Sequence, residues 1–288
     1  MGLIENVLFP VDFSPSSIGM AAYVRRAAAM FGAKVSLIHV VDPAGYSGLE
    51  LYTRSPFEIA EEHLAVGRER LDSFLTAEFP AAECPRILSS GDAATEIART
   101  AREGKFDLII MPTHAGAFRR MLLGSTTAKV LDSAACPVLT SRHAETIEPR
   151  PIEHREWLCA IGISANSARV LRFAKEATAE AHARITILHA VQSAEKNLPV
   201  QLDLEEQLQS AERRAAAERI AELEHQVGLE AHVRIAVGPV KEALLQAARQ
   251  SDADVLMIGR NPHPAATGRL RDLTYAVVRD SPFPVLSI

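Results

Sequence analysis

The nine-residue stretch 33-AKVSLIHVV-41 returns in the second half of the chain as 183-ARITILHAV-191. Both copies have a basic residue second, a hydroxyl-bearing residue fourth and a histidine seventh, within an otherwise apolar run. A short apolar run rich in β-branched residues is typical of a buried strand in a parallel sheet. The two histidines, His39 and His189, are 150 positions apart (189 − 39), which indicates a long internal repeat.

The repeat continues on both sides of this strand. At the same offset, 8-LFPVDFSPSS-17 aligns with 158-LCAIGISANS-167. Later in each half, 107-DLIIMP-112 aligns with 254-DVLMIG-259, now at an offset of 147 (254 − 107). The sequence therefore predicts two homologous domains joined by a polar linker that contains two prolines. Domain 1, the linker and domain 2 are expected at 1–143, 144–154 and 155–288.

Each half alternates short apolar runs with stretches of helical periodicity. The expected strands of the first half are VLFPVD, KVSLIHVV, CPRILSS, DLIIMP and PVLTS. One helix is expected from the N-cap Ser14, with Pro15 at its first position, to a C-cap at Gly32. Another is expected from about Pro56 to Phe79. The apolar faces expected for this helix and its counterpart are Phe57, Ala60, Leu64, Leu71, Phe74 and Leu75, and Leu204, Leu208, Ala211, Ala215, Ile220, Leu223 and Val227.

Strands that alternate with helices form parallel sheets through right-handed crossovers, and helices then cover both faces. We therefore expect an α/β fold with two doubly wound domains. In such sheets ligands bind at the carboxyl ends of the strands, where the strand order reverses. The expected crevice in the first half lies beside the ends of the first and fourth strands. Its walls are then 10-PVDF-13, Val41 and the segment 111–127.

The overall composition excludes several classes of protein. The chain has 288 residues, of which 48% are hydrophobic and 23% charged, as in globular proteins with a real core. Its formal net charge of −5 argues against a nucleic-acid binder that works by neutralising phosphates. No segment has the apolar length of a membrane span, and no basic region precedes the first apolar run as in a signal peptide. The three cysteines are far apart and are interpreted as reduced residues of a cytoplasmic protein without a metal site.

The candidate ligand-binding residues each leave a structural alternative open. Asp12 can accept from an adenine amino group or a ribose hydroxyl, or can only cap the turn into the next helix. Gly124, Ser125 and Thr126 open a helix whose free N–H groups and dipole favour a phosphate, unless Ser125 is simply its N-cap. Arg119 and Arg120 can pair with phosphates or be solvated, and His114 can contact a phosphate, hold a metal or be structural.

The two histidines of the repeated strand have a different interpretation. Because His39 and His189 hold equivalent positions, we expect a shared structural role, such as a buried ring bonded to the backbone. Cys136, which precedes Pro137, is expected to lie in the core at the start of the last strand rather than to act as a nucleophile.

Five motifs in order, present in both halves, resemble the universal stress protein family. They are Pro-Val-Asp-Phe-Ser, Leu-Ile-His-Val-Val-Asp-Pro, Gly-Asp-Ala, Asp-Leu-Ile-Ile-Met-Pro-Thr-His with Leu-Leu-Gly-Ser, and Cys-Pro-Val-Leu. The resemblance implies a tandem member: two Rossmann-like domains, each with a five-stranded parallel sheet. It also implies that the domains pair edge to edge through their last strands, as an intramolecular pseudo-dimer, and that the protein can form a homodimer.

Some members of this family bind ATP through Gly-x-x-Gly, nine residues, then Gly followed by Ser or Thr. By resemblance Asp12 matches the position that contacts adenine, Val41 a backbone position near it, and Gly124 with Ser125 the final pair. Pro112 replaces the first glycine, and the spacing is one residue short, so Ala115 or Gly116 stands in for the second. Proline has no N–H for a phosphate, so this loop is half altered. The predicted cofactor-binding residues are Pro10, Val11, Asp12, Phe13, Val41, Met111, Thr113, His114, Gly116, Arg119, Gly124, Ser125 and Thr126.

The second half departs further from the family pattern. Gly162 replaces Asp12, and Arg271 with Asp272 align with Gly124 and Ser125, which puts a carboxylate where a phosphate would lie. The leading hypothesis is a cytoplasmic stress-response or regulatory protein that binds an adenine nucleotide (ATP) in its first domain only. The alternatives are a slow ATPase that uses Arg119 and His114, and a ligand-free interaction scaffold. No catalytic residue is assigned, and no nucleic acid or membrane is expected as a partner.

Overall fold

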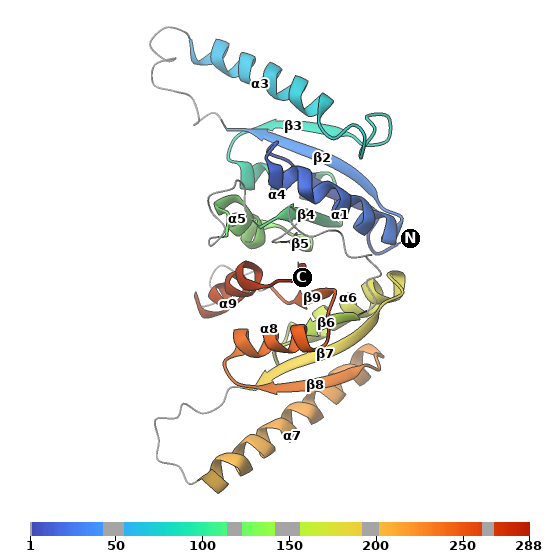
Figure 1. Ribbon diagram of the computed structural model, residues 1–288, viewed down its shortest axis with the longest axis vertical. Coiled ribbons are helices and arrows are strands. Elements are labelled where there is room, and N and C mark those ends of the chain that lie inside the picture. The colour runs from blue at the N-terminus through green and yellow to red at the C-terminus, as the bar shows by residue number, and fades with distance from the viewer. Residues whose placement is uncertain (1, 43–54, 114–122, 142–155, 192–201, 261–267) are drawn as a thin grey trace. The chain divides into compact units, whose positions relative to one another are not determined.

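The computed structural model describes residues 2–42, 55–113, 123–141, 156–191, 202–260 and 268–288. The chain divides into two compact units, Met1–Ile152 and Glu153–Ile288. Each unit is an α/β domain whose strands are covered by helices (Figure 1). Within the described ranges, no helix combines the length and the apolar composition that a membrane span requires.

The first unit contains one five-stranded parallel sheet. Its elements in chain order are β1 (Asn6–Pro10), α1 (Pro15–Phe31), β2 (Lys34–Val41), α3 (Pro56–Ser73), β3 (Arg86–Ser90), α4 (Ala93–Glu103), β4 (Leu108–Pro112), α5 (Ser125–Ser133) and β5 (Val138–Ser141). The strand order is β3-β2-β1-β4-β5, and every neighbouring pair is parallel. All five strands expected from the sequence are therefore confirmed.

The second unit repeats this plan. Its elements are β6 (Glu156–Ala160), α6 (Ser167–Glu180), β7 (Arg184–Val191), α7 (Leu202–Val227), β8 (His232–Val237), α8 (Val240–Gln250), β9 (Val255–Ile258), α9 (Gly268–Asp280) and β10 (Val285–Ser287). Its strand order is β10-β9-β6-β7-β8, again all parallel. The predicted pairing of the two domains into a pseudo-dimer stays a prediction.

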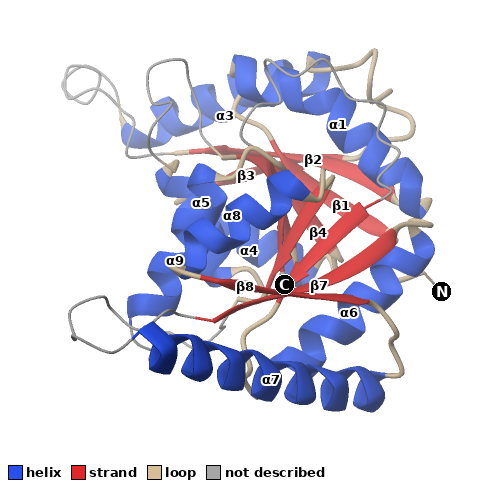
Figure 2. Ribbon diagram, turned by 60° about the horizontal axis from the view of Figure 1, so that its bottom comes forward, coloured by secondary structure: helices blue, strands red, loops and turns tan. Residues whose placement is uncertain are grey.

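Right-handed crossovers place the helices on both faces of each sheet. In the first unit α1 and α3 connect β1 to β2 and β2 to β3, on one side of the reversal. The other two helices cross back, since α4 connects β3 to β4 and α5 connects β4 to β5. The helices therefore form two layers with the strands between them (Figure 2). The strand order reverses between β1 and β4, which are neighbours with Val7 opposite Leu108 and Leu8 opposite Ile109. Leu8, Phe9 and Ile109, on these two central strands, are fully buried.

The caps of α1 are those the sequence predicts. The Ser14 side chain accepts a hydrogen bond from the Ser17 N–H at 3.3 Å, and Pro15 occupies the first helical position. The helix ends at Gly32, whose φ of 63° is the left-handed conformation that glycine adopts without strain.

The repeat extends to single backbone bonds. The Gly91 N–H donates to the Val41 carbonyl at 3.0 Å, and the Gly238 N–H donates to the Val191 carbonyl at the same distance. Both glycines have a positive φ, 144° and 135°, a region that side-chain-bearing residues rarely adopt. The two units thus have the same turn directly after their third strands, β3 and β8, at the predicted offset of 147 (238 − 91).

The sequence-based boundary of α3 is wrong at its C-terminal end. The helix stops at Ser73 rather than near Phe79, because Phe74 is extended (ψ 130°) and Leu75 is left-handed (φ 50°). Phe79 nevertheless reaches the core, where it is 4% exposed and packs on Phe9 with ring centroids 6.1 Å apart. Of the predicted apolar face, Leu71 is buried, and periodicity did not detect the break after Ser73.

The predicted apolar faces of α3 and α7 are wrong at their N-terminal ends. Phe57 is 70% exposed and Leu208 is 51% exposed, whereas Ile59, Leu71 and Ile220 are the residues that are fully buried. Both helices begin beyond the carboxyl ends of the strands that they cover (Figure 1). An α7 of 26 residues is about 39 Å long, whereas the eight residues of β7 span about 26 Å. The first turns therefore have no sheet beneath them.

Candidate functional site

The sequence predicts a crevice at the carboxyl ends of β1 and β4, and these strands are neighbours where the strand order reverses. Val11 continues from the end of β1, where its N–H donates to the Ile38 carbonyl at 2.8 Å. Thr113 continues from the end of the neighbouring β4, where its N–H donates to the Ser141 carbonyl at 3.1 Å. Pro10 and Val11 on one side, and Met111 and Thr113 on the other, are buried. Because their side chains are buried beneath this edge of the sheet, the contacts that they can offer a ligand are chiefly backbone ones.

Asp12 follows this floor on the β1 side and is exposed. Its Oδ1 accepts the Ser14 N–H at 3.1 Å and the Ser17 hydroxyl at 2.6 Å. Its Oδ2 has no hydrogen-bond partner among the described residues. The two interpretations of Asp12 therefore do not exclude each other, since one oxygen supports the turn into α1 and the other stays available.

Val41 ends β2 on the other side of β1 and is 8% exposed. Its carbonyl already accepts the Gly91 N–H. A ligand at this position would share that oxygen, which retains a second lone pair.

The N-terminus of α5 carries no side-chain cap. Gly124 is the N-cap residue, with φ −60° and ψ 140°, and Ser125 is the first residue of the helix. The alternative that Ser125 is the N-cap is therefore wrong. Among the described residues, the N–H groups of Ser125, Thr126 and Thr127 have no acceptor, as is usual for a first helical turn without a cap. These N–H groups and the positive end of the helix dipole favour an anion.

Two hydrogen bonds hold the two ends of the 114–122 segment together. The Gly124 N–H donates to the Thr113 carbonyl at 2.8 Å, and the Thr127 hydroxyl donates to the Pro112 carbonyl at 3.0 Å. Pro112 is still part of β4, opposite Ser141 of β5, so the chain first turns after it. The Gly124 N–H is thus already used within the protein.

Three predicted site residues, His114, Gly116 and Arg119, lie outside the described residues, as does Arg120. Thr127, in contrast, was not among the predicted site residues although it forms one of these two bonds. The run of hydroxyl residues in 125-STT-127 contained that signal, because a threonine in a first turn often bonds to nearby backbone.

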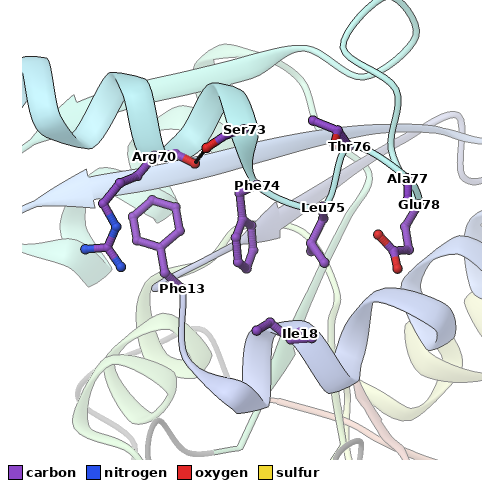
Figure 3. A pocket seen from close by; sticks show the side chains of 9 residues that line it. All are labelled: Phe13, Ile18, Arg70, Ser73, Phe74, Leu75, Thr76, Ala77 and Glu78. Atoms are coloured by element: carbon purple, nitrogen blue, oxygen red, sulfur yellow. Dashed lines mark hydrogen bonds between the residues drawn. The ribbon is translucent and has the colours of Figure 1, made fainter.

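The Phe13 side chain points away from this crevice, towards α3. Its ring lies 4.3 Å from the His39 ring and 5.0 Å from the Phe74 ring, centroid to centroid. The Arg70 guanidinium lies over the same ring at 4.3 Å, which is a cation–π geometry. Figure 3 shows Phe13 between Arg70 and Phe74, at one end of a hollow of about 500 Å³ whose walls include Ile18. Only the backbone of Phe13 therefore remains available to the predicted crevice.

The repeated histidines have the structural role that the sequence predicts. The His39 Nδ1 lies 2.9 Å from the Val11 carbonyl oxygen, and the His189 Nδ1 lies 2.9 Å from the Ile161 carbonyl oxygen. The His39 ring thus joins β2 to the residue after β1, and the His189 ring joins β7 to the residue after β6. His39 thereby fixes the backbone directly before Asp12.

Burial gives His39 a pH-dependent effect on stability. Desolvation lowers the pKa of His39 below its ordinary 6.5, the hydrogen bond to Val11 opposes this, and the Arg70 charge reinforces it. Because the pKa is lower in the folded state, the stabilisation is fully present above pH 6.5 and is lost as the pH falls below it. We expect the unfolding temperature of the protein to fall more between pH 7.5 and 5.5 than that of His39→Gln, measured by calorimetry. Equal falls would show that proton uptake by His39 is not involved.

The corresponding edge of the second unit lacks the carboxylate. At Gly162, the position of Asp12, the Ser167 hydroxyl bonds instead to the Gly162 carbonyl, and it accepts the Ser164 N–H at 3.0 Å. The helix start also differs from the alignment, because α9 begins at Gly268. Asp272 therefore lies about one turn inside α9, whereas Ser125, with which it aligns, is the first residue of α5. That a carboxylate takes the place of a phosphate there stays a prediction. The run 269-RLR-271 favours helix, which extends α9 towards its N-terminus.

Neither a metal centre nor a reactive thiol is visible in the part of the chain that the structure describes. No group of three or more His, Cys, Asp or Glu side chains there is placed to hold a metal ion. None of the three cysteines forms a disulfide bond, and Cys84 and Cys159 are buried. Burial raises the pKa of the Cys159 thiol to about 12, so it stays protonated and unreactive. Cys136 is half-buried and precedes β5 by two residues, so it lies less deep than the sequence predicts.

Comparisons with known proteins agree with this architecture. A universal stress protein from Methanocaldococcus jannaschii is 33% identical over 140 residues, which is 48% of this chain and 81% of that protein. A universal stress protein from Thermus aquaticus is 31% identical over 144 residues, 49% of this chain and all of that protein. Single-domain relatives thus match about half of this chain.

Solved structures match the whole chain. The crystal structure of a universal stress protein from Archaeoglobus fulgidus covers 99% of this chain and 96% of its own, with a TM-score of 0.65 and 22% identity. A functionally unknown protein from Pseudomonas aeruginosa covers 99% and 92%, with a TM-score of 0.61 and 17% identity. At these identities the likeness shows the fold alone. The family model of the universal stress protein family matches two segments in tandem, residues 4–142 and 155–288, and the chain belongs to that family as a two-domain member.

Proposed function

We propose that the protein is a cytoplasmic stress-response or regulatory protein whose first domain binds an adenine nucleotide, ATP, at the crevice between β1 and β4. The observation that carries the proposal is the N-terminus of α5 at the switch point of the sheet, which has no side-chain cap and whose first N–H groups have no acceptor among the described residues. A helix terminus at this place favours phosphate groups.

The phosphates would lie against the first turn of α5. The N–H groups of Ser125, Thr126 and Thr127 supply donors, and the Ser125 and Thr126 hydroxyls can add two more. The Gly124 N–H is not among them, because it donates to Thr113. The cradle therefore differs from the family's glycine-rich one: donors come from the helix, and the entry strand stays paired to its end at Pro112.

The base would lie at the opposite side, near Asp12 and Val41. A carboxylate accepts hydrogen bonds and offers none. The Oδ2 of Asp12, which has no partner among the described residues, therefore suits the 6-amino group of adenine or a ribose hydroxyl. The buried residues Pro10, Val11 and Met111 would support the ligand from below.

We propose binding rather than turnover. A slow ATPase would depend on His114 and Arg119, which lie outside the described residues. Oδ1 of Asp12 is also committed to Ser14 and Ser17, which leaves one oxygen for any Mg²⁺. The second domain lacks the Asp12 carboxylate at Gly162, so we propose one nucleotide per chain.

The proposal is tested by titrating purified protein with ATP and with AMP in a calorimeter, after mass spectrometry of any nucleotide retained through purification. We expect saturable ATP binding with a stoichiometry of one per chain. A flat titration with both nucleotides at millimolar concentration would contradict the proposal and leave the scaffold alternative. A stoichiometry of two would show that the second domain also binds.

A further inference from the structure

Ser17 closes a small hydrogen-bonded ring with Asp12. Its hydroxyl donates to the Asp12 Oδ1 at 2.6 Å and accepts the N–H of the same residue at 3.3 Å. Ser17 is 1% exposed, so water does not compete for its hydroxyl. Together with the Ser14 N–H at 3.1 Å, it gives Oδ1 two donors. Oδ2 has no hydrogen-bond partner among the described residues, so the carboxylate is held with one oxygen turned to the protein.

The other repeat shows what the same serine does without a carboxylate. Ser167 is 150 positions after Ser17 and is also buried, at 3% exposed. Its hydroxyl bonds to the Gly162 carbonyl and to the Ser164 N–H. Support of the turn is therefore common to both serines, and contact with a site carboxylate belongs to Ser17 alone. The two roles can be separated by comparing the two positions.

We propose that Ser17 is a positioning residue that fixes the Asp12 carboxylate for base recognition and so sets a preference for adenine over hypoxanthine nucleotides. This inference rests on the proposed function. Adenine carries an amino donor at its 6-position, whereas hypoxanthine carries a carbonyl that would face the carboxylate oxygen with no proton between them. A carboxylate that cannot rotate discriminates between the two bases, because its oxygen cannot move away from the hypoxanthine carbonyl. Without the Ser17 hydroxyl, one donor is lost and the carboxylate can turn.

The test compares the affinities for ATP and for ITP by calorimetry in the wild type, Ser17→Ala and Ser167→Ala. ITP has a carbonyl where ATP has the 6-amino group of its base, and its N1 therefore carries a proton. We expect the wild type to prefer ATP by at least about tenfold, since a site built for a donor rejects an analogue that lacks it. In Ser17→Ala we expect that preference to fall by about three- to tenfold, the size of one typical hydrogen bond. In Ser167→Ala it should not change.

Each result has a separate meaning. Ser167→Ala measures the loss of turn support, and the two alanine variants should have similar unfolding temperatures. A wild-type preference retained within twofold in Ser17→Ala overturns the positioning role while leaving nucleotide binding intact. Absence of ATP binding in the wild type refutes the proposed function itself, and with it this inference. Should Ser17→Ala fail to fold, Ser17→Cys keeps the side-chain volume with a weaker donor, and a preference equal to that of the wild type in this variant also overturns the role.

Discussion

Gly124→Asp is expected to weaken ATP binding by at least about tenfold, or about 1.4 kcal/mol, while leaving the fold intact. Gly124 has φ −60° and ψ 140°, which any residue adopts, so the backbone tolerates a side chain there. Aspartate is a preferred N-cap, and its carboxylate would accept hydrogen bonds from the N–H groups in the first turn of α5. The new side chain would thus occupy the place of the phosphate and repel it.

The size of this effect follows from charge. Two unit charges 4 Å apart near a protein surface interact by about 4 kcal/mol before salt screening, so a tenfold loss is a lower bound. Ser55→Asp is the matched control, because it adds the same charge at the N-cap of α3 in the same unit and retains a capping oxygen. Affinity should be measured by calorimetry and folding by thermal melting. Unchanged ATP affinity in a folded Gly124→Asp protein would place the phosphates elsewhere.

Much of the fold could be predicted because its signals are local or repeated. Two similar strands 150 residues apart predicted the tandem design, and alternating elements predicted the parallel sheets. The caps of α1 followed from Ser14, Pro15 and Gly32, whose side chains or backbones have only a few favourable places in a helix. The side-by-side placement of the first and fourth strands was also predicted, and the crevice expected at their ends stays a prediction.

The parts that could not be predicted depend on contacts distant in sequence. Nothing near Phe13 indicates that its ring packs on His39 and Phe74 instead of facing the crevice. The end of α3 depends on two unusual backbone angles at Phe74 and Leu75, and neither residue type signals them. Phe13 was assigned to the crevice by its place after the first strand, which does not fix the direction of its side chain. The end of α3 was misplaced because apolar periodicity indicates burial but not where a helix stops.

A third kind of signal was visible but had no assigned role. Asp107 and Asp254 stand at equivalent positions, each directly before the buried strand of a repeated motif. The structure shows why both halves have the carboxylate. The Asp107 Oδ2 accepts the N–H groups of Glu5 and Asn6, each at 2.9 Å, and the Asp254 Oδ2 accepts the N–H of Glu156 at 2.9 Å. Each aspartate therefore ties the fourth strand of its unit to the start of the first.

Asp107→Ala is expected to lower the free energy of unfolding by about 2–4 kcal/mol, because it removes two bonds to a charged acceptor and leaves two part-buried N–H groups without a partner. The Asp107 N–H also donates to the Asn6 carbonyl at 2.9 Å, and this backbone bond alone would then hold β1 to β4 at this end. Because β1 carries Val11 and Asp12 at its other end, weaker pairing should also loosen the proposed nucleotide site.

The measurement is urea denaturation of the wild type, Asp107→Ala, Asp254→Ala and the control Asp72→Ala. Asp72 is exposed and lies 3.9 Å from Arg68, so its loss should change stability by less than about 0.5 kcal/mol. Asp254→Ala should destabilise in the same direction as Asp107→Ala, since the two carboxylates hold equivalent strands. If Asp107→Ala were as stable as Asp72→Ala, water would have to replace the carboxylate at both N–H groups without cost, and the aspartate would have no structural role in joining the two strands.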